Sequence, residues 1–125
     1  MPVRILTVDD HLPFLRLAHQ LVDATPGFES VGEAPSGEDA LARIDETEPE
    51  LMLIDVRMPG MGGAEVARRV ADAHPEIVVV LISADDQPEL PPAVHRCGAA
   101  ELVRKQDLAP ALLQALWKKH QRGPT

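Results

Sequence analysis

The stretch LMLIDVRMPGMGG (residues 51–63) decides the fold, because it has the pattern of a buried β-strand followed directly by a loop rich in proline and glycine. It opens with four apolar residues and then places one carboxylate, Asp55, directly before a loop that proline and glycine interrupt. Two further runs share this apolar, β-branched character: VRILTV at residues 3–8 and IVVVLI at residues 77–82. Nearly continuous apolar strands predict a parallel sheet that helices cover on both faces.

Segments with helical periodicity lie between these strands. The first predicted helix has an apolar face made of Phe14, Leu17, Ala18, Leu21 and Val22. The sequence SGED at residues 36–39 resembles a capping box with Asp in place of the usual Glu, which indicates where a second helix starts. A third helix is expected over residues 65–73.

Prolines limit the fourth helix and help to place the fifth. Pro88, Pro91 and Pro92 confine a fourth helix to a short piece at about residues 91–97. The last helix is expected to begin near Asp107 as its N-cap, with Pro110 in the first turn, where a missing N–H costs little. Strand and helix then alternate five times, which predicts a doubly wound parallel sheet with right-handed crossovers.

Composition narrows the class of protein. The formal net charge is −8 and the 12 basic residues are scattered, which argues against direct binding of nucleic acid by this chain. No apolar run approaches the roughly 20 residues that cross a bilayer, so we expect no membrane segment and a cytoplasmic location. Cys97 is the single cysteine, so no internal disulfide can form.

Polar side chains stand at the ends of four predicted strands. The first strand ends at Asp9 and Asp10, the third at Asp55, the fourth at Ser83, and the fifth, AELVR, at Lys105. Ligands of doubly wound sheets bind at this carboxyl edge, where all four ends meet. Three crowded carboxylates repel one another or require a cation, and Mg²⁺ is the hard ion that such oxygen ligands favour.

Asp55 is the candidate nucleophile of this cluster. A carboxylate that attacks phosphorus forms an acyl phosphate. Phosphoryl transfer depends mostly on positioning and charge neutralisation, which Mg²⁺ on one side and Lys105 on the other would supply. Ser83 would donate a hydrogen bond to a phosphoryl oxygen. Taken singly, these residues are also compatible with a turn, a strand end and a solvated surface charge; their combination at one edge favours the site.

Four segments together resemble the receiver domain of bacterial two-component response regulators. They are VDDH at residues 8–11, LIDVRMPGMGG at 53–63, ISA at 82–84 and GAAELVRK at 98–105. The resemblance covers residues 3–116 and implies a flavodoxin-like (βα)₅ sheet with strand order 2-1-3-4-5. We expect a receiver domain over residues 1–120 and a tail, or the start of a linker, at residues 121–125.

The resemblance also implies a role for each matching position. Asp55 would accept a phosphoryl group from a partner sensor histidine kinase. Asp9 and Asp10, with Asp55 and the backbone carbonyl of Arg57, would hold Mg²⁺. Ser83 would be the switch hydroxyl and Lys105 the lysine that pairs with the phosphate.

The partners implied by the resemblance extend beyond the kinase. The DDH opening, and a lysine that no proline follows, are similar to the subclass that carries a helix-turn-helix output domain after the receiver. The implied partners are therefore this output domain or an effector protein. A homodimer through the first and last helices, or through the fourth helix and last strands, stays open.

Two positions depart from the family pattern. Leu102 stands where relatives usually have Tyr or Phe, so the inward-turning ring of the switch is missing. Gln106 stands where many relatives have Pro, commonly after a cis bond, and without Pro such a bond would be very costly.

Two other function classes compete with the switch. A Mg²⁺-dependent phosphohydrolase with an aspartyl nucleophile usually has a second Asp two residues later, where this chain has Arg57. A phosphorylation-independent pseudo-receiver, acting as an interaction module, remains open because of Leu102. A dinucleotide site is excluded because the first turn lacks glycines. We also expect Arg57 and Asp85 to pair and to slow loss of the phosphate.

Overall fold

The computed structural model describes residues 1–84 and 90–121. Three expectations therefore fall on positions outside the described residues: the pairing of Arg57 with Asp85, the place of Pro88, and residues 122–125 of the expected tail. None of the helices in the described ranges has the length and apolar character that crossing a bilayer requires.

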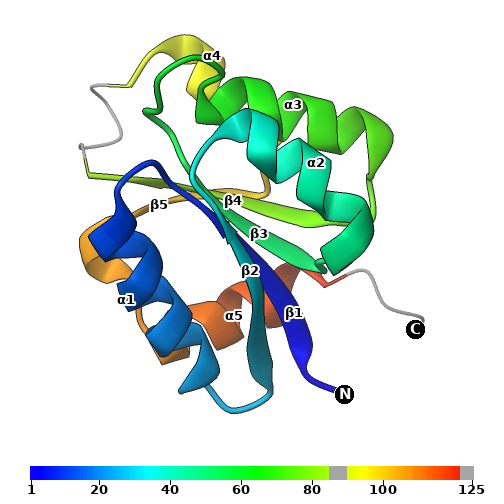
Figure 1. The fold of residues 1–125 in the computed structure, drawn as a ribbon, viewed down its shortest axis with the longest axis vertical. Coiled ribbons are helices and arrows are strands. Elements are labelled where there is room, and N and C mark those ends of the chain that lie inside the picture. Colours follow the sequence, from blue (N-terminus) through cyan, green and yellow to red (C-terminus); the bar gives the residue numbers. More distant parts are fainter. Residues whose placement is uncertain (85–89, 122–125) are drawn as a thin grey trace.

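A single parallel sheet forms the centre of the molecule (Figure 1). Its strands are β1 (Val3–Val8), β2 (Phe28–Ala34), β3 (Leu51–Asp55), β4 (Val78–Ser83) and β5 (Glu101–Arg104). They pair in the order β2-β1-β3-β4-β5, and every neighbouring pair is parallel. The predicted flavodoxin-like fold and its strand order are therefore confirmed.

Helices cover the two faces of this sheet in separate layers (Figure 1). The helices are α1 (Leu12–Asp23), α2 (Gly37–Thr47), α3 (Gly63–Ala73), α4 (Pro92–His95) and α5 (Pro110–His120). In Figure 1, α2, α3 and α4 lie on one side of the sheet, and α1 and α5 lie on the other. A 3₁₀ turn at Lys105–Asp107 connects β5 to the segment before α5.

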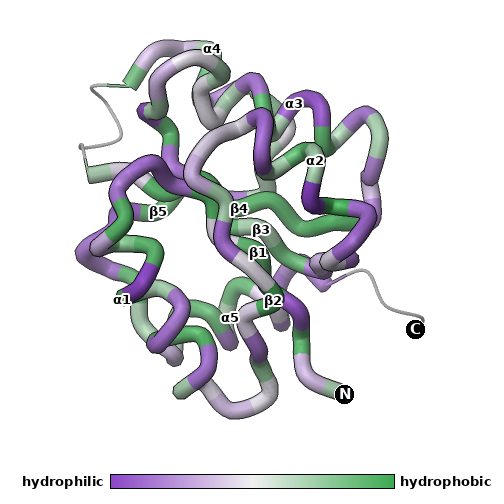
Figure 2. Tube along the Cα trace, viewed as in Figure 1, coloured by the Kyte–Doolittle hydropathy of each residue, from purple (hydrophilic) through white to green (hydrophobic). Residues whose placement is uncertain are grey.

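Two apolar layers hold the helices to the sheet, because successive side chains of a strand point to opposite faces. Met52 and Ile54 join the layer under α2, α3 and α4, whereas Leu51 and Leu53 join the layer under α1 and α5. All the residues of β3 and β4 are buried, as the continuous apolar runs predicted. In Figure 2 the trace is mostly green (hydrophobic) along these central strands, whereas green and purple alternate along the helices.

The apolar face of α1 differs from the prediction at one position. Phe14, Ala18 and Val22 are buried, but Leu17 is 58% exposed and Leu15 is buried instead. At 3.6 residues per turn, residues 14, 18 and 22 form a slowly turning row that moves toward the side of Leu15 and away from Leu17. The prediction for Leu17 was therefore wrong.

The start of α5 also differs from the prediction. Ala109 is the N-cap and Pro110 the first helical residue, so Asp107 is not the cap; it lies in the preceding 3₁₀ turn. The reason is local, since a residue before proline is driven into an extended conformation, and Ala109 has φ −158° and ψ 161°. The predicted place of Pro110 in the first turn is confirmed.

Other predicted boundaries hold closely. Ser36 caps α2, where its hydroxyl accepts a hydrogen bond of 3.1 Å from the backbone N–H of Asp39. The third helix begins at Gly63, two residues before the expected start, and α4 covers only Pro92–His95 of the expected residues 91–97. The sequence pattern did not locate β2, because most of this edge strand is only partly buried and the strand has no continuous apolar run.

Candidate functional site

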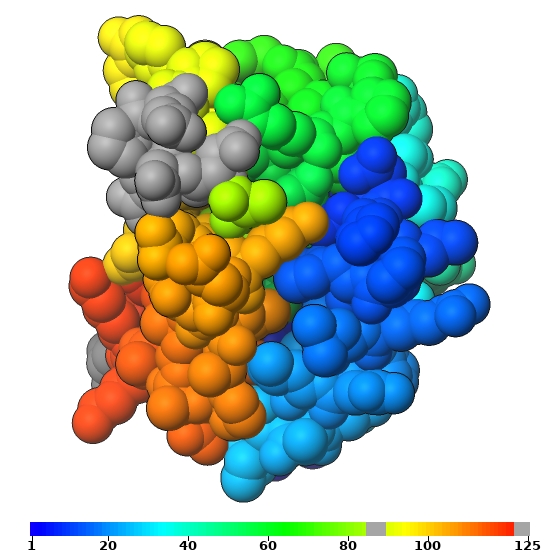
Figure 3. All heavy atoms as spheres, turned by 90° about the vertical axis from the view of Figure 1, so that its left-hand side faces the viewer, coloured from blue at the N-terminus to red at the C-terminus, as the bar shows by residue number. Residues whose placement is uncertain are grey.

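The sheet brings the predicted site residues to one edge. Asp9 directly follows β1, Asp55 is the last residue of β3, Ser83 ends β4, and Lys105 directly follows β5. Because all five strands are parallel, these positions share the carboxyl edge of the sheet. The strand order reverses at β1, with β2 on one side and β3 on the other, and doubly wound sheets bind ligands next to such a reversal. Figure 3 looks onto this side of the molecule, where β5 and the segment after it (orange) meet the beginning of α1 (blue).

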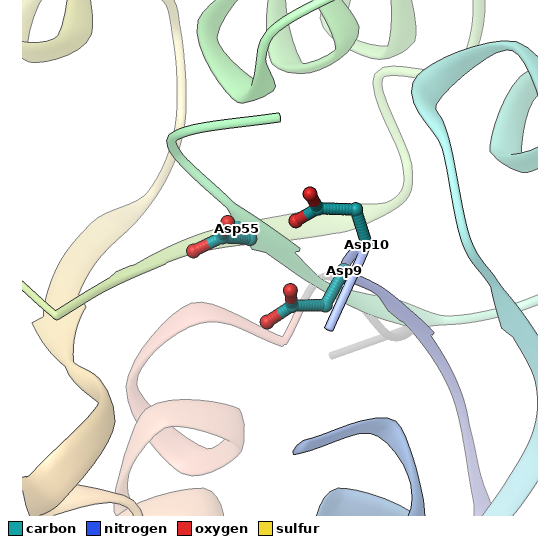
Figure 4. A group of neighbouring side chains, drawn as sticks. All are labelled: Asp9, Asp10 and Asp55. Atoms are coloured by element: carbon teal, nitrogen blue, oxygen red, sulfur yellow. The ribbon is translucent and has the colours of Figure 1, made fainter. Parts of the chain in front are cut away.

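Three carboxylates converge at this edge. Asp9, Asp10 and Asp55 each offer an oxygen, and these oxygens lie within 4.8 Å of one another. In Figure 4 the three carboxylates point in the same general direction from the ends of β1 and β3. Asp9 is fully buried, Asp55 is 6% exposed, and Asp10 is open to solvent. The cluster can therefore be reached from outside while two of its members are held by the fold.

Asp9 has one oxygen used by the backbone and one directed to the cluster. Its Oδ1 accepts a hydrogen bond of 2.9 Å from the backbone N–H of His11. Its Oδ2 forms an ion pair of 2.6 Å with Lys105 Nζ, and no other described group donates a hydrogen bond to it. A buried carboxylate oxygen with unused acceptor capacity, beside two further carboxylates, fits a hard divalent cation such as Mg²⁺.

Lys105 places a positive charge against the same carboxylates. Its Nζ lies 2.6 Å from Asp9 Oδ2 and 3.4 Å from Asp55 Oδ1. Burial disfavours the charged ammonium, but hydrogen bonding and attraction to Asp9 and Asp55 outweigh this effect and raise the pKa of Lys105. The ammonium therefore stays charged at neutral pH and balances part of the negative charge.

The surroundings of Asp55 disfavour its ionised form. Burial, and then repulsion from Asp9, raise the pKa of Asp55 from 3.8 to about 6, although Lys105 acts in the opposite direction. An added cation would relieve this repulsion, and a covalent bond at one oxygen would remove the full negative charge from the carboxylate. The arrangement thus suits a carboxylate that binds a cation and reacts as a nucleophile.

The backbone of Asp55 is fixed by helix α3. The N–H of Gly63 donates a hydrogen bond of 3.0 Å to the carbonyl of Val56. A Cβ atom at Gly63 would lie 2.3 Å from the backbone oxygen of Asp55 and 2.9 Å from Cα of Val56. Only glycine permits this approach, so α3 begins directly against the residue that carries the candidate nucleophile.

Ser83, at the end of β4, and Arg57, in the loop after β3, complete the predicted set. Ser83 is 2% exposed and follows Ile82, which pairs with Asp55 in the sheet. Arg57 lies two residues beyond β3 with an exposed side chain, and its backbone carbonyl remains a predicted Mg²⁺ ligand. Leu102 is partly buried and packs on the apolar layer beneath α2, α3 and α4.

Sequence reasoning missed one neighbour of the site. Phe14 was predicted only as a core residue of the first helix, yet its ring centroid lies 4.4 Å from Lys105 Nζ. The sequence gives no signal for this contact, because it depends on how α1 packs beside the turn that follows β5.

Comparison with known proteins shows what this chain is similar to. A family model described as the response regulator receiver domain matches residues 5–117. The response regulator GacA of Pseudomonas viridiflava is 36% identical over 115 residues, which cover 91% of this chain and 53% of the relative. The chain thus spans about half the length of that relative.

A second relative and a solved structure extend the comparison. Protein-glutamate methylesterase/protein-glutamine glutaminase 5 of Myxococcus xanthus is 40% identical over 106 residues, covering 83% of this chain and 30% of the relative. The signal receiver domain of the putative response regulator NarL from Mycobacterium tuberculosis superposes with a TM-score of 0.80 at 34% identity. That alignment covers 92% of this chain and 96% of the other.

Proposed function

Because this chain belongs to the family of response regulator receiver domains, we propose that it is a phosphorylation-driven switch whose phosphoacceptor is Asp55. The observation that carries the proposal is the convergence of Asp9, Asp10 and Asp55 with the Lys105 ammonium at one edge of the sheet. The phosphoryl donor in the cell would be a partner sensor histidine kinase.

The carboxylates of Asp9, Asp10 and Asp55, with the backbone carbonyl of Arg57, would hold Mg²⁺. When bound, Mg²⁺ supplies neutralisation of phosphoryl charge. Asp9 Oδ2 supports this assignment, since it is buried and its only described donor is the Lys105 ammonium.

In the proposed transfer an oxygen of Asp55 attacks the phosphorus atom of the donor. A bond forms between this oxygen and phosphorus, while the bond from phosphorus to the imidazole nitrogen of the kinase histidine breaks and the imidazole leaves with the bonding electrons. Lys105 pairs with one phosphoryl oxygen and the hydroxyl of Ser83 donates a hydrogen bond to another. The chain thereby catalyses its own phosphorylation and, with water as the attacking group, its own dephosphorylation.

The conformational response would begin at Ser83. Its movement toward the phosphoryl group biases a pre-existing two-state equilibrium in α4 and β5. With Leu102 in place of an aromatic ring, repacking of an aliphatic side chain would replace the usual ring movement.

The changed surface would act on an output domain or an effector protein, or on a second copy of the chain. GacA, the relative named above, is about twice as long as the matched region, and the DDH opening supports a helix-turn-helix output domain for the whole regulator. On this reading residues 1–120 form the receiver domain, and residues 121–125 are a tail or the start of a linker. The protein acts in the cytoplasm without direct contact between this chain and nucleic acid.

Mass spectrometry after incubation with Mg²⁺ and acetyl phosphate tests the proposal. We expect the wild type to gain the mass of one phosphoryl group, and we expect Asp55→Asn, or wild type with a chelator, to gain none. Labelling that persists in Asp55→Asn would refute the assignment of the phosphoacceptor. A folded wild type that gains no label would favour the pseudo-receiver, the alternative that Leu102 supports.

A further inference from the structure

The apolar core reaches the proposed phosphorylation site at Phe14. This residue lies in the first turn of α1, is 8% exposed, and belongs to the apolar layer between the sheet and helices α1 and α5. Its ring centroid nevertheless lies 4.4 Å from Lys105 Nζ. One aromatic side chain thus serves the packing of α1 and also faces the cation of the site.

Three groups surround the Lys105 ammonium. Two are carboxylate oxygens, at 2.6 Å from Asp9 and 3.4 Å from Asp55, and the third is the face of the Phe14 ring. The side chain of Lys105 is 20% exposed, so little of it is in contact with water. The four-carbon stem of a lysine is flexible, so the position of its ammonium depends on such contacts. The attraction between an aromatic face and an ammonium is strongest where water is excluded.

The three contacts respond differently to the proposed reaction. Binding of Mg²⁺ to Asp9 weakens the attraction between this carboxylate and the ammonium, and formation of the acyl phosphate removes the charge from Asp55. The attraction of the ring depends on its own quadrupole, so neither event alters it. Of these three contacts, the one with Phe14 is therefore the one whose attraction neither event weakens.

We infer that Phe14 is a positioning residue that holds the Lys105 ammonium at the site where the phosphoryl group arrives. The inference rests on the proposed function and extends it to a residue outside the acidic cluster. Phe14 itself touches neither the metal nor the phosphoryl group in this role; it acts through Lys105.

Fluorinated phenylalanines at position 14 separate this role from packing, because fluorine weakens the quadrupole of the ring and largely keeps its shape. The rate of labelling by acetyl phosphate is measured at saturating Mg²⁺ for the wild type, for rings of increasing fluorination, and for Phe14→Leu and Phe14→Tyr. We expect the rate to fall step by step with fluorination, by about 2- to 30-fold at full fluorination and in Phe14→Leu, and to recover in Phe14→Tyr. The same series at Phe28, the other phenylalanine, on the far edge strand β2, should leave the rate unchanged.

A second readout follows Lys105 directly. The protons beside its Nζ should show an upfield ring-current shift in the NMR spectrum of the wild type, and Phe14→Leu should remove this shift. A labelled wild type whose rate is insensitive to fluorination at position 14 would overturn the inference and leave the proposed function intact. A wild type that takes no label would overturn both, and absence of the ring-current shift would overturn the inference whatever the rates. If Phe14→Leu does not fold, the fluorinated series decides.

Discussion

At the scale of single residues, the ionisation of Asp55 links the site to the stability of the fold. Burial and the charge of Asp9 place its pKa at about 6, compared with 3.8 for the ordinary group. Between these two pH values the folded state binds a proton that the unfolded state has released, so the free energy of unfolding falls as pH rises. The stabilisation is complete below about pH 4 and is lost above about pH 6.

The fall in unfolding free energy with rising pH leads to a prediction for the metal-free protein. Asp55→Asn removes the cost of the buried charge, so at pH 7.5 the variant should be more stable than the wild type by up to roughly 3 kcal/mol, and this advantage should be lost near pH 4. Denaturant unfolding with a chelator present measures both values. The control is Asp72→Asn, a substitution at an exposed position at the far end of α3. The difference in unfolding free energy between this variant and the wild type should not show the same gain at pH 7.5 and loss near pH 4. An Asp55→Asn variant less stable than the wild type at pH 7.5 would contradict the assigned cost.

Addition of Mg²⁺ should act in the opposite direction. A cation that binds only the folded state stabilises it, by roughly 2.7 kcal/mol when the free ion is at 100 times its dissociation constant. We expect Mg²⁺ to raise the unfolding temperature of the wild type at pH 7.5, a chelator to reverse the effect, and Asp9→Asn to lose most of it. Ca²⁺ serves as the comparison for a general ionic effect. An equal rise in Asp9→Asn would remove Asp9 from the set of ligands.

At the scale of elements, the contact between α3 and β3 fixes the position of Asp55. A methyl group at Gly63 would meet backbone atoms that cannot move aside independently. Gly63→Ala should therefore displace the start of α3, lower the free energy of unfolding by about 1–3 kcal/mol, and slow labelling by acetyl phosphate.

Gly62→Ser is the matched control for this substitution. Its Cβ would meet only the backbone oxygen of Val56 at 3.5 Å, an ordinary contact, and serine suits the N-cap position that Gly62 occupies. Unfolding and labelling close to those of the wild type are expected for this variant. Equal losses in the two variants would show that the loop, rather than the close approach at Gly63, is what matters.

Elements also differ in how well the sequence predicts them. The buried strands β3 and β4 and the capped start of α2 follow from apolar runs and one serine, which are local signals. The prediction for Asp107 was wrong because a proline three residues later had the stronger local effect. The edge strand β2 lacks a clear pattern, since its partly exposed positions accept polar residues.

At the scale of the whole molecule, the site could be predicted because a parallel sheet collects its carboxyl ends at one edge. This rule needs only the strand ends at Asp9, Asp55, Ser83 and Lys105, and the structure brings Asp9, Asp55 and Lys105 into contact distance. The ring of Phe14 over Lys105 could not be predicted in this way, because it depends on the packing of a helix against a turn from the other end of the chain.

The proposed switch gives a prediction for the distribution of motion. If phosphorylation biases α4 and β5, amide hydrogen exchange should change mainly at residues 90–104 when acetyl phosphate and Mg²⁺ are added. Residues of β1 and β2 should change little. Asp55→Asn under the same conditions is the control and should show no change in either region. A change spread evenly over the sheet would contradict a localised two-state element.

The position of Lys105 after the last strand has a consequence for protein synthesis. Asp9 emerges from the ribosome early, but its counter-charge is among the last residues of the domain to appear and docks only when β5 joins β4. A nascent chain that ends before β5 contains Asp9 and Asp55 but lacks the Lys105 ammonium that forms ion pairs with them. If Lys105 acts as proposed, a chain truncated before residue 105 would therefore fail to take a phosphoryl group on Asp55, and only the completed domain would respond to a phosphoryl donor.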